Sequence, residues 1–317
     1  MVRNVIFLFV GVFLLISNLH AQELKDPADW VCKELVKNRR GGVVPQILGG
    51  TSVQEGEFPH MALIGYMLPG RPPILSFECG GTLISDQFVL TAAHCVLNKD
   101  EKVPNRVRLG TLNKNLTDNF NTTLTDYLVA ESLVHPQFQR IKKNNDIALL
   151  RLARRVEDFT QTVYPACLDY NKIDPTTIMS IAGWGKHIKG SVNTSDVLLK
   201  AYVEAVPAND CTVFFNSGQW SRNYPDGIPA NQMCAKGARN NTDADTCEGD
   251  SGGPLQLPVE KSISRVVGVT SFGKICGYQN PGIYTRVSSF LDWITNTVWP
   301  GESYKTFISR LRKPTII

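Results

Sequence analysis

The chain alternates between short apolar runs and turn-forming residues from residue 47 onward. Runs of three to nine β-forming residues bounded by Gly, Pro and Asn predict antiparallel strands packed as a sandwich or barrel. The expected strands are Met61–Tyr66, Gly81–Ile84, Val107–Leu109, Tyr127–Val134, Ile147–Leu152, Met179–Ala182, Leu198–Val206, Arg265–Phe272 and Gly282–Val287.

The pattern changes to helical spacing near the C-terminus. Apolar residues at positions 287, 290, 291, 294 and 298 predict one packing helix over Val287–Val298, and Pro300 with Gly301 marks its end. The basic tail 301–317 follows. We interpret it as a frayed, solvated tail, with docking on a partner or an acidic polysaccharide as the alternative.

The N-terminus has the pattern of a secretory signal. Arg3 precedes an apolar run, Val5–Ile16, and the small residue Ala21 ends the polar stretch after it. The run is shorter than the roughly 20 residues that span a bilayer, which argues against a membrane anchor. We therefore expect a signal peptide over 1–21, a propeptide or light-chain segment over 22–46, and a secreted, extracellular protein.

Cysteine usage and sequons agree with that compartment. The eight cysteines are even in number and include no CxxC pair, so a disulfide framework is favoured over zinc. Four N-x-S/T sequons, at Asn115, Asn121, Asn193 and Asn240, predict glycans on surface loops. The composition, 43% hydrophobic and 20% charged, suits a folded core, and a net charge of +4 makes no case for nucleic-acid binding.

Three short motifs carry the candidate chemistry. They are Thr91–Cys95 (TAAHC), Asp146–Leu150 (DIALL) and Gly249–Pro254 (GDSGGP), which supply His94, Asp146 and Ser251 in that order. Each alone has an ordinary structural explanation. Together they contain the nucleophile, the base and the orienting carboxylate that hydroxyl-based acyl transfer requires.

With these motifs the sequence resembles the chymotrypsin/trypsin family of serine proteases, over Ile47 to about Pro300. Further matching segments are Ile47–Gly50, Cys79–Gly81, Ala182–Gly185 and Pro281–Thr285. The resemblance implies an all-β fold of two six-stranded antiparallel β-barrels with a C-terminal helix, and a protease domain over 47–300. It implies that Ser251 is the nucleophile, His94 its base and Asp146 the carboxylate that orients the imidazole.

The same resemblance implies the binding residues. The backbone N–H groups of Gly249 and Ser251 would form the oxyanion hole. Asp245 would lie at the floor of the primary pocket and Gly273 and Gly282 at its walls, which predicts cleavage after Arg or Lys. A catalytically silent homologue that acts as a cofactor or decoy is the alternative, and the intact triad argues against it.

Disulfides and activation also follow from the resemblance. The pairing implied is Cys79–Cys95, Cys211–Cys234 and Cys247–Cys276, with Cys32–Cys167 tethering the propeptide. Activation would free Ile47 to pair with Asp250. Because Gln46 precedes that bond, we expect either an activating protease that is not trypsin-like or activation in two steps.

Regulation and partners are predicted in the same way. No metal and no cofactor are expected, since Thr111 replaces the glutamate of calcium-binding members. The string Glu57–Met61 and the non-basic activation site resemble arthropod haemolymph proteases of the snake/persephone kind, although a single cysteine in the propeptide cannot build their clip domain. That resemblance implies protein substrates such as other zymogens, an upstream activating protease, serpin-type inhibitors and a role in innate immunity, with no nucleic acid and no membrane as partners.

Overall fold

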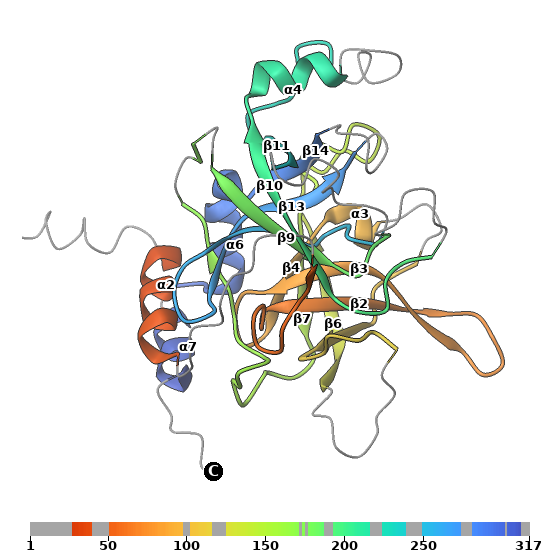
Figure 1. The fold of residues 1–317 in the computed structure, drawn as a ribbon. Coiled ribbons are helices and arrows are strands. Elements are labelled where there is room, and N and C mark those ends of the chain that lie inside the picture. The colour runs from red at the N-terminus through yellow and green to blue at the C-terminus, as the bar shows by residue number, and fades with distance from the viewer. Residues whose placement is uncertain are drawn as a thin grey trace, which may run out of the picture.

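The computed structural model describes residues 27–39, 51–97, 102–115, 125–170, 173–174, 177–186, 193–215, 224–238, 249–273, 281–301 and 303–311. Two closed β-barrels lie next to each other in the middle of the molecule, and helices lie at its edges (Figure 1). None of the helices in these residues is both long enough and apolar enough to cross a bilayer.

The first barrel closes in the order β2–β3–β4–β7–β6–β5, with every neighbouring pair antiparallel and β5 pairing back to β2. Its interior is packed with fully buried aliphatic side chains. The strands are β2 (Met61–Leu68), β3 (Ile74–Leu83), β4 (Phe88–Thr91), β5 (Arg106–Leu109), β6 (Thr125–Val134) and β7 (Ala148–Leu152).

The second barrel closes in the order β10–β11–β14–β13–β12–β9, with β9 pairing back to β10. Two short strands extend this sheet: β1 is antiparallel to β10, and β8 is parallel to β13. The strands are β1 (Thr51–Ser52), β8 (Cys167–Leu168), β9 (Ile178–Gly183), β10 (Leu199–Val206), β11 (Gln232–Gly237), β12 (Pro254–Pro258), β13 (Ser264–Phe272) and β14 (Gly282–Arg286). The predicted fold class, two six-stranded antiparallel barrels, is therefore confirmed.

Five α-helices lie in the described residues, together with one 3₁₀ turn over Val287–Phe290. The helices are α2 (Pro27–Asn38), α3 (Ala93–Val96), α4 (Ala208–Phe215), α6 (Leu291–Val298) and α7 (Ser303–Leu311). The predicted C-terminal helix is confirmed as the 3₁₀ turn followed by α6. Its apolar side chains pack into the main core, and the next turn contains Gly301 at a φ of 60°.

The two ends of the described chain form a feature that the sequence patterns did not predict. Helix α2 and helix α7 pack against each other at one edge of the molecule (Figure 1). Trp30 and Tyr304 meet edge to face with ring centroids 5.2 Å apart. We call this pair of helices the clasp.

The clasp corrects the interpretation of the C-terminal segment as a solvated tail. Phe307 and Ile308 of α7 are each only 2% exposed and belong to the main core. Arg310 forms an ion pair with the buried carboxylate of Asp86, which also binds Arg155. An apolar face with a charged anchor makes residues 303–311 a packed part of the fold.

The last turn of helix α2 is hydrogen-bonded to residues of the barrel region. The Tyr164 hydroxyl donates to the Leu35 carbonyl at 2.9 Å, and the Lys261 ammonium donates to the Val36 carbonyl at 3.1 Å. The side chain of Arg39 stacks over the Tyr164 ring, 4.5 Å from its centroid, and donates to the Thr160 carbonyl at 2.7 Å. Carbonyls at a helix end need such donors because they have no partner within the helix.

Three of the four predicted disulfides are present. Cys32–Cys167 joins α2 to β8, Cys79–Cys95 joins β3 to α3, and Cys211–Cys234 joins α4 to β11. Cys247 and Cys276 lie outside the described residues, as do the sequons at Asn121 and Asn240. The sequon residues Asn115 and Asn193 are exposed, as glycan attachment would require.

Candidate active site

Asp146 and His94 are joined through two hydrogen bonds in the first barrel. Asp146 lies two residues before β7 and is 0% exposed, while His94 lies in the single-turn helix α3 after β4. The backbone N–H of His94 donates to Asp146 Oδ1 at 2.9 Å, and His94 Nδ1 lies 2.8 Å from Asp146 Oδ2. One carboxylate therefore fixes both the backbone and the ring of the histidine.

The charge of Asp146 decides which nitrogen of His94 carries the proton. Burial alone would raise the pKa of the Asp146 carboxyl, but the charge and hydrogen bond of His94, the charge of Lys143 and the Ser271 hydroxyl hold it below its ordinary value of 3.8. An ionised carboxylate can only accept hydrogen bonds, so Nδ1 must be the donor. Nε2 of the neutral imidazole is then an acceptor, which is the form a general base needs.

Ser251 lies in a tight turn that bridges the two barrels. Its carbonyl accepts from the Gly80 N–H in β3 at 2.8 Å, and the next N–H, of Gly252, donates to the Thr270 carbonyl in β13 at 2.9 Å. Gly252 has a φ of 78°, and a Cβ there would lie 2.2 Å from Thr91 Oγ1. Only glycine can therefore occupy this position without displacing the strand that leads to His94.

The structure brings the predicted catalytic residues to one place at the junction of the barrels. Cys95, next to His94, has its Sγ 3.6 Å from the Ser251 carbonyl oxygen. The described residues contain no hydrogen bond between the His94 ring and the Ser251 hydroxyl. Such contacts are often long in proteins without substrate and tighten when it binds.

The family model named Trypsin matches residues 47–294. The chain belongs to the trypsin family of serine proteases. The similar curated proteins include insect members of this family, which agrees with the resemblance drawn from the sequence.

Three of these relatives show how far the similarity extends. Serine protease Hayan from Drosophila melanogaster is 38% identical over 91% of this chain and 44% of its own length. Serine protease snk from the same organism is 40% identical over 79% of this chain and 56% of its own length. Phenoloxidase-activating enzyme 1 from Spodoptera litura is 34% identical over 80% and 67%. The chain thus spans about half the length of the first two relatives.

The predicted walls of the trypsin-family pocket come together in the second barrel. A Cβ built on Gly273 would lie 3.9 Å from the Cα of Gly282, so the two glycines face each other across a narrow space. Both directly adjoin paired residues of β13 and β14. Asp245, predicted at the pocket floor, lies outside the described residues.

Asp250, the predicted partner of a new N-terminus, is held against β9 and the turn that follows it. Its Oδ1 accepts from the Gly185 N–H at 2.8 Å. Cβ atoms on Gly183 or Gly185 would lie 2.0 Å and 2.4 Å from the carboxylate oxygens, so this close approach requires glycine at both positions. Gln46 and Ile47, the other predicted activation residues, lie outside the described residues.

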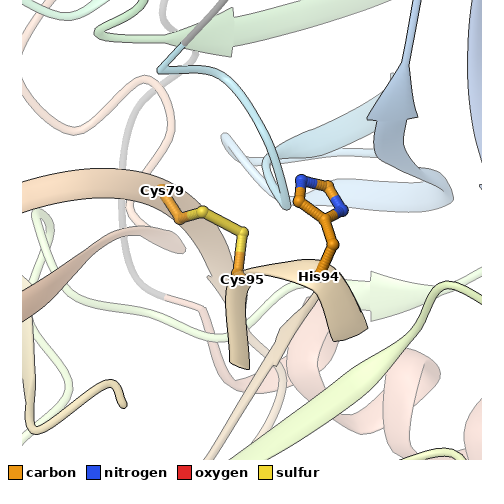
Figure 2. A group of neighbouring side chains, drawn as sticks. All are labelled: Cys79, His94 and Cys95. Carbon is orange, nitrogen blue, oxygen red and sulfur yellow. A yellow bond between two sulfur atoms is a disulfide. The ribbon is translucent and has the colours of Figure 1, made fainter. Parts of the chain in front are cut away.

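A cluster with metal-binding residue types lies beside the triad but does not have metal-binding chemistry. One potential ligand atom from each of Cys79, His94 and Cys95 lies within 4.8 Å of the others. Figure 2 shows that the two sulfurs are joined to each other and that the His94 ring extends away from them. A disulfide offers no thiolate, so this group cannot bind a cation as a cysteine site does.

Sequence reasoning missed two contributors to this site. Ser271 in β13 is 3% exposed and donates its hydroxyl to Asp146 Oδ2, and the Thr285 hydroxyl donates to the Asp146 carbonyl at 2.8 Å. The one available signal for Ser271 was its place two residues before the predicted pocket residue Gly273. Through these two bonds the second barrel holds the candidate catalytic residue Asp146 of the first.

Proposed function

We propose that the chain is the zymogen of a secreted serine endopeptidase that cleaves proteins after arginine or lysine. The observation that carries the proposal is the fully buried, ionised Asp146 that binds Nδ1 of His94 and leaves Nε2 as the base. A buried charge destabilises a protein unless other groups compensate it. Here the carboxylate is hydrogen-bonded to an imidazole beside the Ser251 turn, which indicates a functional role.

The chemistry follows from these groups. Nε2 of His94 takes the proton of the Ser251 hydroxyl as its oxygen attacks the scissile carbonyl carbon. The oxyanion accepts hydrogen bonds from the N–H groups of Gly249 and Ser251, neither of which donates to another atom within the described residues. The imidazolium then protonates the leaving amine, and water releases the acyl group by the same steps in reverse.

Specificity for arginine or lysine depends on a carboxylate at the bottom of the primary pocket. The facing glycines Gly273 and Gly282 leave space for a long side chain, and Asp245 supplies the opposite charge. A buried carboxylate left without a partner is unfavourable, so apolar residues should be poor substrates at this position.

Activation couples a peptide-bond cut to the Ser251 turn. Cleavage after Gln46 frees Ile47, whose ammonium pairs with the carboxylate of Asp250. Strand β1, which begins four residues after Ile47, is paired with β10 of the second barrel. Removing one partner of a buried ion pair costs about 3–5 kcal/mol, which is enough to keep the uncut form inactive.

The relatives suggest a role in a proteolytic cascade, in which the substrates include other zymogens and serpin-type inhibitors end the reaction. Melanization protease 1 of Drosophila melanogaster and phenoloxidase-activating enzyme 1 are named for such processes. A secreted, glycosylated protein with an N-terminal segment held by Cys32–Cys167 suits that role.

The activity test uses the variant Gln46→Arg, which gives trypsin a cleavable bond before Ile47. After treatment with immobilised trypsin, we expect rapid hydrolysis of Arg and Lys peptides and labelling by a fluorophosphonate. Ser251→Ala, treated identically, is the control for residual trypsin. An Ile47 form that leaves these peptides whole and Ser251 unlabelled would refute the proposal and favour the silent homologue.

The activator is tested on the unaltered chain. Trypsin should cut it without producing an active Ile47 terminus, because Gln46 is not a trypsin site. Sequencing the new N-terminus decides the point. An active Ile47 form made by trypsin alone would show that the expectation of a different or two-step activator is wrong.

A further inference from the structure

A strongly basic loop directly precedes the catalytic carboxylate. Residues 139–145, which we call the basic loop, contain three cations in four positions: Arg140, Lys142 and Lys143. Arg140 and Lys142 are exposed, and Ile141 between them is 85% exposed. A charged run of this kind is most often a solvated surface, so its geometry has to decide whether it has another role.

The backbone of the basic loop is fixed from within. The Gln139 N–H donates to the Asn144 carbonyl at 3.0 Å, and the Asn145 side chain donates to the Gln137 carbonyl at 2.8 Å. Lys143 and Asn145 both have a φ of 53°, a conformation that non-glycine residues seldom adopt. Such strain persists only where the surroundings impose it and is concentrated at functional sites.

The second barrel also holds the loop, although the loop belongs to the first. The Tyr224 hydroxyl donates to the Lys142 carbonyl, and the Gln232 amide donates to the Lys143 carbonyl at 2.9 Å. Asn231 donates to the Asn145 side chain at 2.7 Å. Because the backbone groups are used in this way, the side chains of Arg140, Ile141 and Lys142 are left on the outside.

A chain of contacts connects the loop to the reacting groups. The Tyr224 ring stacks on Phe272, with centroids 6.0 Å apart and planes 15° from parallel. Phe272 follows Ser271, which donates to Asp146, and precedes the pocket residue Gly273. A substrate side chain that enters between Gly273 and Gly282 would therefore lie next to Phe272, whose ring stacks on the residue that binds the basic loop.

The charges of Arg140 and Lys142 are not neutralised by ion pairs with described residues. Within the described part of the chain, neither Arg140 nor Lys142 forms an ion pair, whereas Arg108, Arg151 and Lys102 on the same barrel all do. Arg140 and Lys142 lie two positions apart on a fixed backbone. They therefore create a positive potential beside the candidate active site, which attracts anionic groups.

We propose that the basic loop selects protein substrates that carry acidic side chains within about four residues of the scissile bond, an apolar neighbour packing against Ile141. This inference rests on the proposed function and adds the substrate class. An exposed ion pair changes binding by about fivefold at most, so two cations should give a preference of about tenfold.

The test uses the trypsin-treated Gln46→Arg protein, hereafter the two-chain enzyme, and pairs of peptides with the same scissile arginine. Each pair differs only in Asp against Asn at one of the four positions on either side. At low salt we expect kcat/KM to favour Asp about tenfold at one or more positions, and the preference to weaken in 0.5 M NaCl because exposed charges are screened.

The double variant Arg140→Gln/Lys142→Gln should lose this preference. The matched control is Lys33→Gln/Lys37→Gln, which removes two charges from α2, where these side chains are 72% and 71% exposed. It should retain the preference, and equal thermal midpoints for all three proteins would show that each is folded. The readout is the Asp/Asn ratio, which a purely structural change would not alter.

The possible failures can be told apart. If Asn peptides are cleaved well but Asp brings no advantage, or if the double variant keeps it, the basic loop does not select substrates while the enzyme assignment stands. If the double variant loses only its retention on a heparin column, the loop binds an acidic polysaccharide and the inference is wrong. If no peptide is cleaved at all, the proposed function fails and this inference fails with it.

Discussion

The candidate active site around His94, Asp146 and Ser251, called the cleft below, and the clasp are both built from distant parts of the chain, but with opposite chemistry. The cleft gathers a buried carboxylate, an imidazole and hydroxyls, and it stabilises the charge of Asp146 with hydrogen bonds. The clasp joins α2 and α7 through aromatic and aliphatic side chains, and the disulfide Cys32–Cys167 lies beside them. Among these side chains, Val31, Leu35, Phe307 and Ile308 are each at most 2% exposed.

The difference suggests that activity and stability depend on separate regions. Organised polar groups in the cleft stabilise charge that develops during reaction, whereas they contribute little net folding energy after desolvation. Buried apolar surface in the clasp contributes folding energy without touching the reacting atoms. Substitutions in the two regions should therefore have effects that do not overlap.

The largest effect should come from Asp146→Asn, measured in the two-chain enzyme. An amide can donate to Nδ1 and so favours the wrong tautomer of His94, which lowers kcat by about 10⁴-fold in other members of this family. Peptide hydrolysis gives the rate, and a urea melt should show a nearly unchanged protein. A loss below tenfold would mean that Asp146 does not orient His94.

The next effect tests the clasp. Phe307→Ala removes a ring that packs against Phe159 and Trp299, and truncation of a buried Phe costs about 3–5 kcal/mol of unfolding free energy. kcat/KM for a short peptide should stay within about twofold of the parent enzyme. Phe214→Ala on α4, where the ring is 40% exposed, is the matched control and should cost less than about 1 kcal/mol. Equal costs at the two sites would show that α7 is not a packed part of the fold.

A histidine between the barrels combines features of both regions. Its side chain can titrate, like the groups of the cleft, and it is fully buried, like the core side chains of the clasp. His60 is 0% exposed and its Nε2 lies 2.6 Å from Gln256 Oε1. Burial is the main reason why the pKa of His60 is lowered from 6.5 to about 4. The charge of Arg39 also lowers this pKa, whereas the hydrogen bond to Gln256 raises it. The unfolded chain then binds a proton that the folded one does not, so stability falls as the pH drops below 6.5 and stops falling below about 4.

The loss is about 2.5 pH units at 1.36 kcal/mol each, or roughly 3 kcal/mol. Urea midpoints at pH 7, 5.5 and 4 measure it. His60→Gln keeps a hydrogen-bonding side chain but cannot titrate, so it should lose about 3 kcal/mol less than the parent over this range. Parallel pH profiles for the two proteins would contradict the prediction.

The smallest predicted effect concerns Ser271 in the cleft. Ser271→Ala removes one hydrogen bond to Asp146 Oδ2 and should lower kcat/KM about tenfold, because a bond to a charged group contributes about 1.5 kcal/mol or somewhat more. Thr270→Val removes the neighbouring hydroxyl, which is buried and has no hydrogen-bond partner among the described residues, and should leave the rate unchanged. Equal rates for Ser271→Ala and the parent would limit Ser271 to a structural role.

The sequence predicted the strands that have clear apolar runs and missed those that do not. β4 is buried at all four positions and so shows no alternation, while β12 begins and ends with proline. Strands without a clear alternating pattern are recognised only by their partners, since backbone pairing across a barrel depends on residues far away in the chain. β11 was missed for a similar reason. The strand follows turn residues and ends at Gly237, so its few apolar positions do not form a clear run.

The two helices of the clasp have apolar residues at helical spacing in the sequence. Ala28, Val31, Cys32 and Leu35 follow helical spacing, and Tyr304, Phe307, Ile308 and Leu311 do so as well. Helices this short are unstable alone in water and form because their apolar faces are covered. What covers α2 is α7 together with β8, which no local pattern could reveal.

The sequence by itself determined the chemical groups of this protein. TAAHC, DIALL and GDSGGP supply His94, Asp146 and Ser251, and glycines stand where a side chain would collide with the backbone or with Asp250. The tertiary structure alone decided that Asp146 is buried yet charged, that Ser271 supports it, and that the basic loop and the clasp are held in place. Those properties depend on desolvation and on contacts between residues more than fifty positions apart, which exist only after the two barrels have closed and packed together.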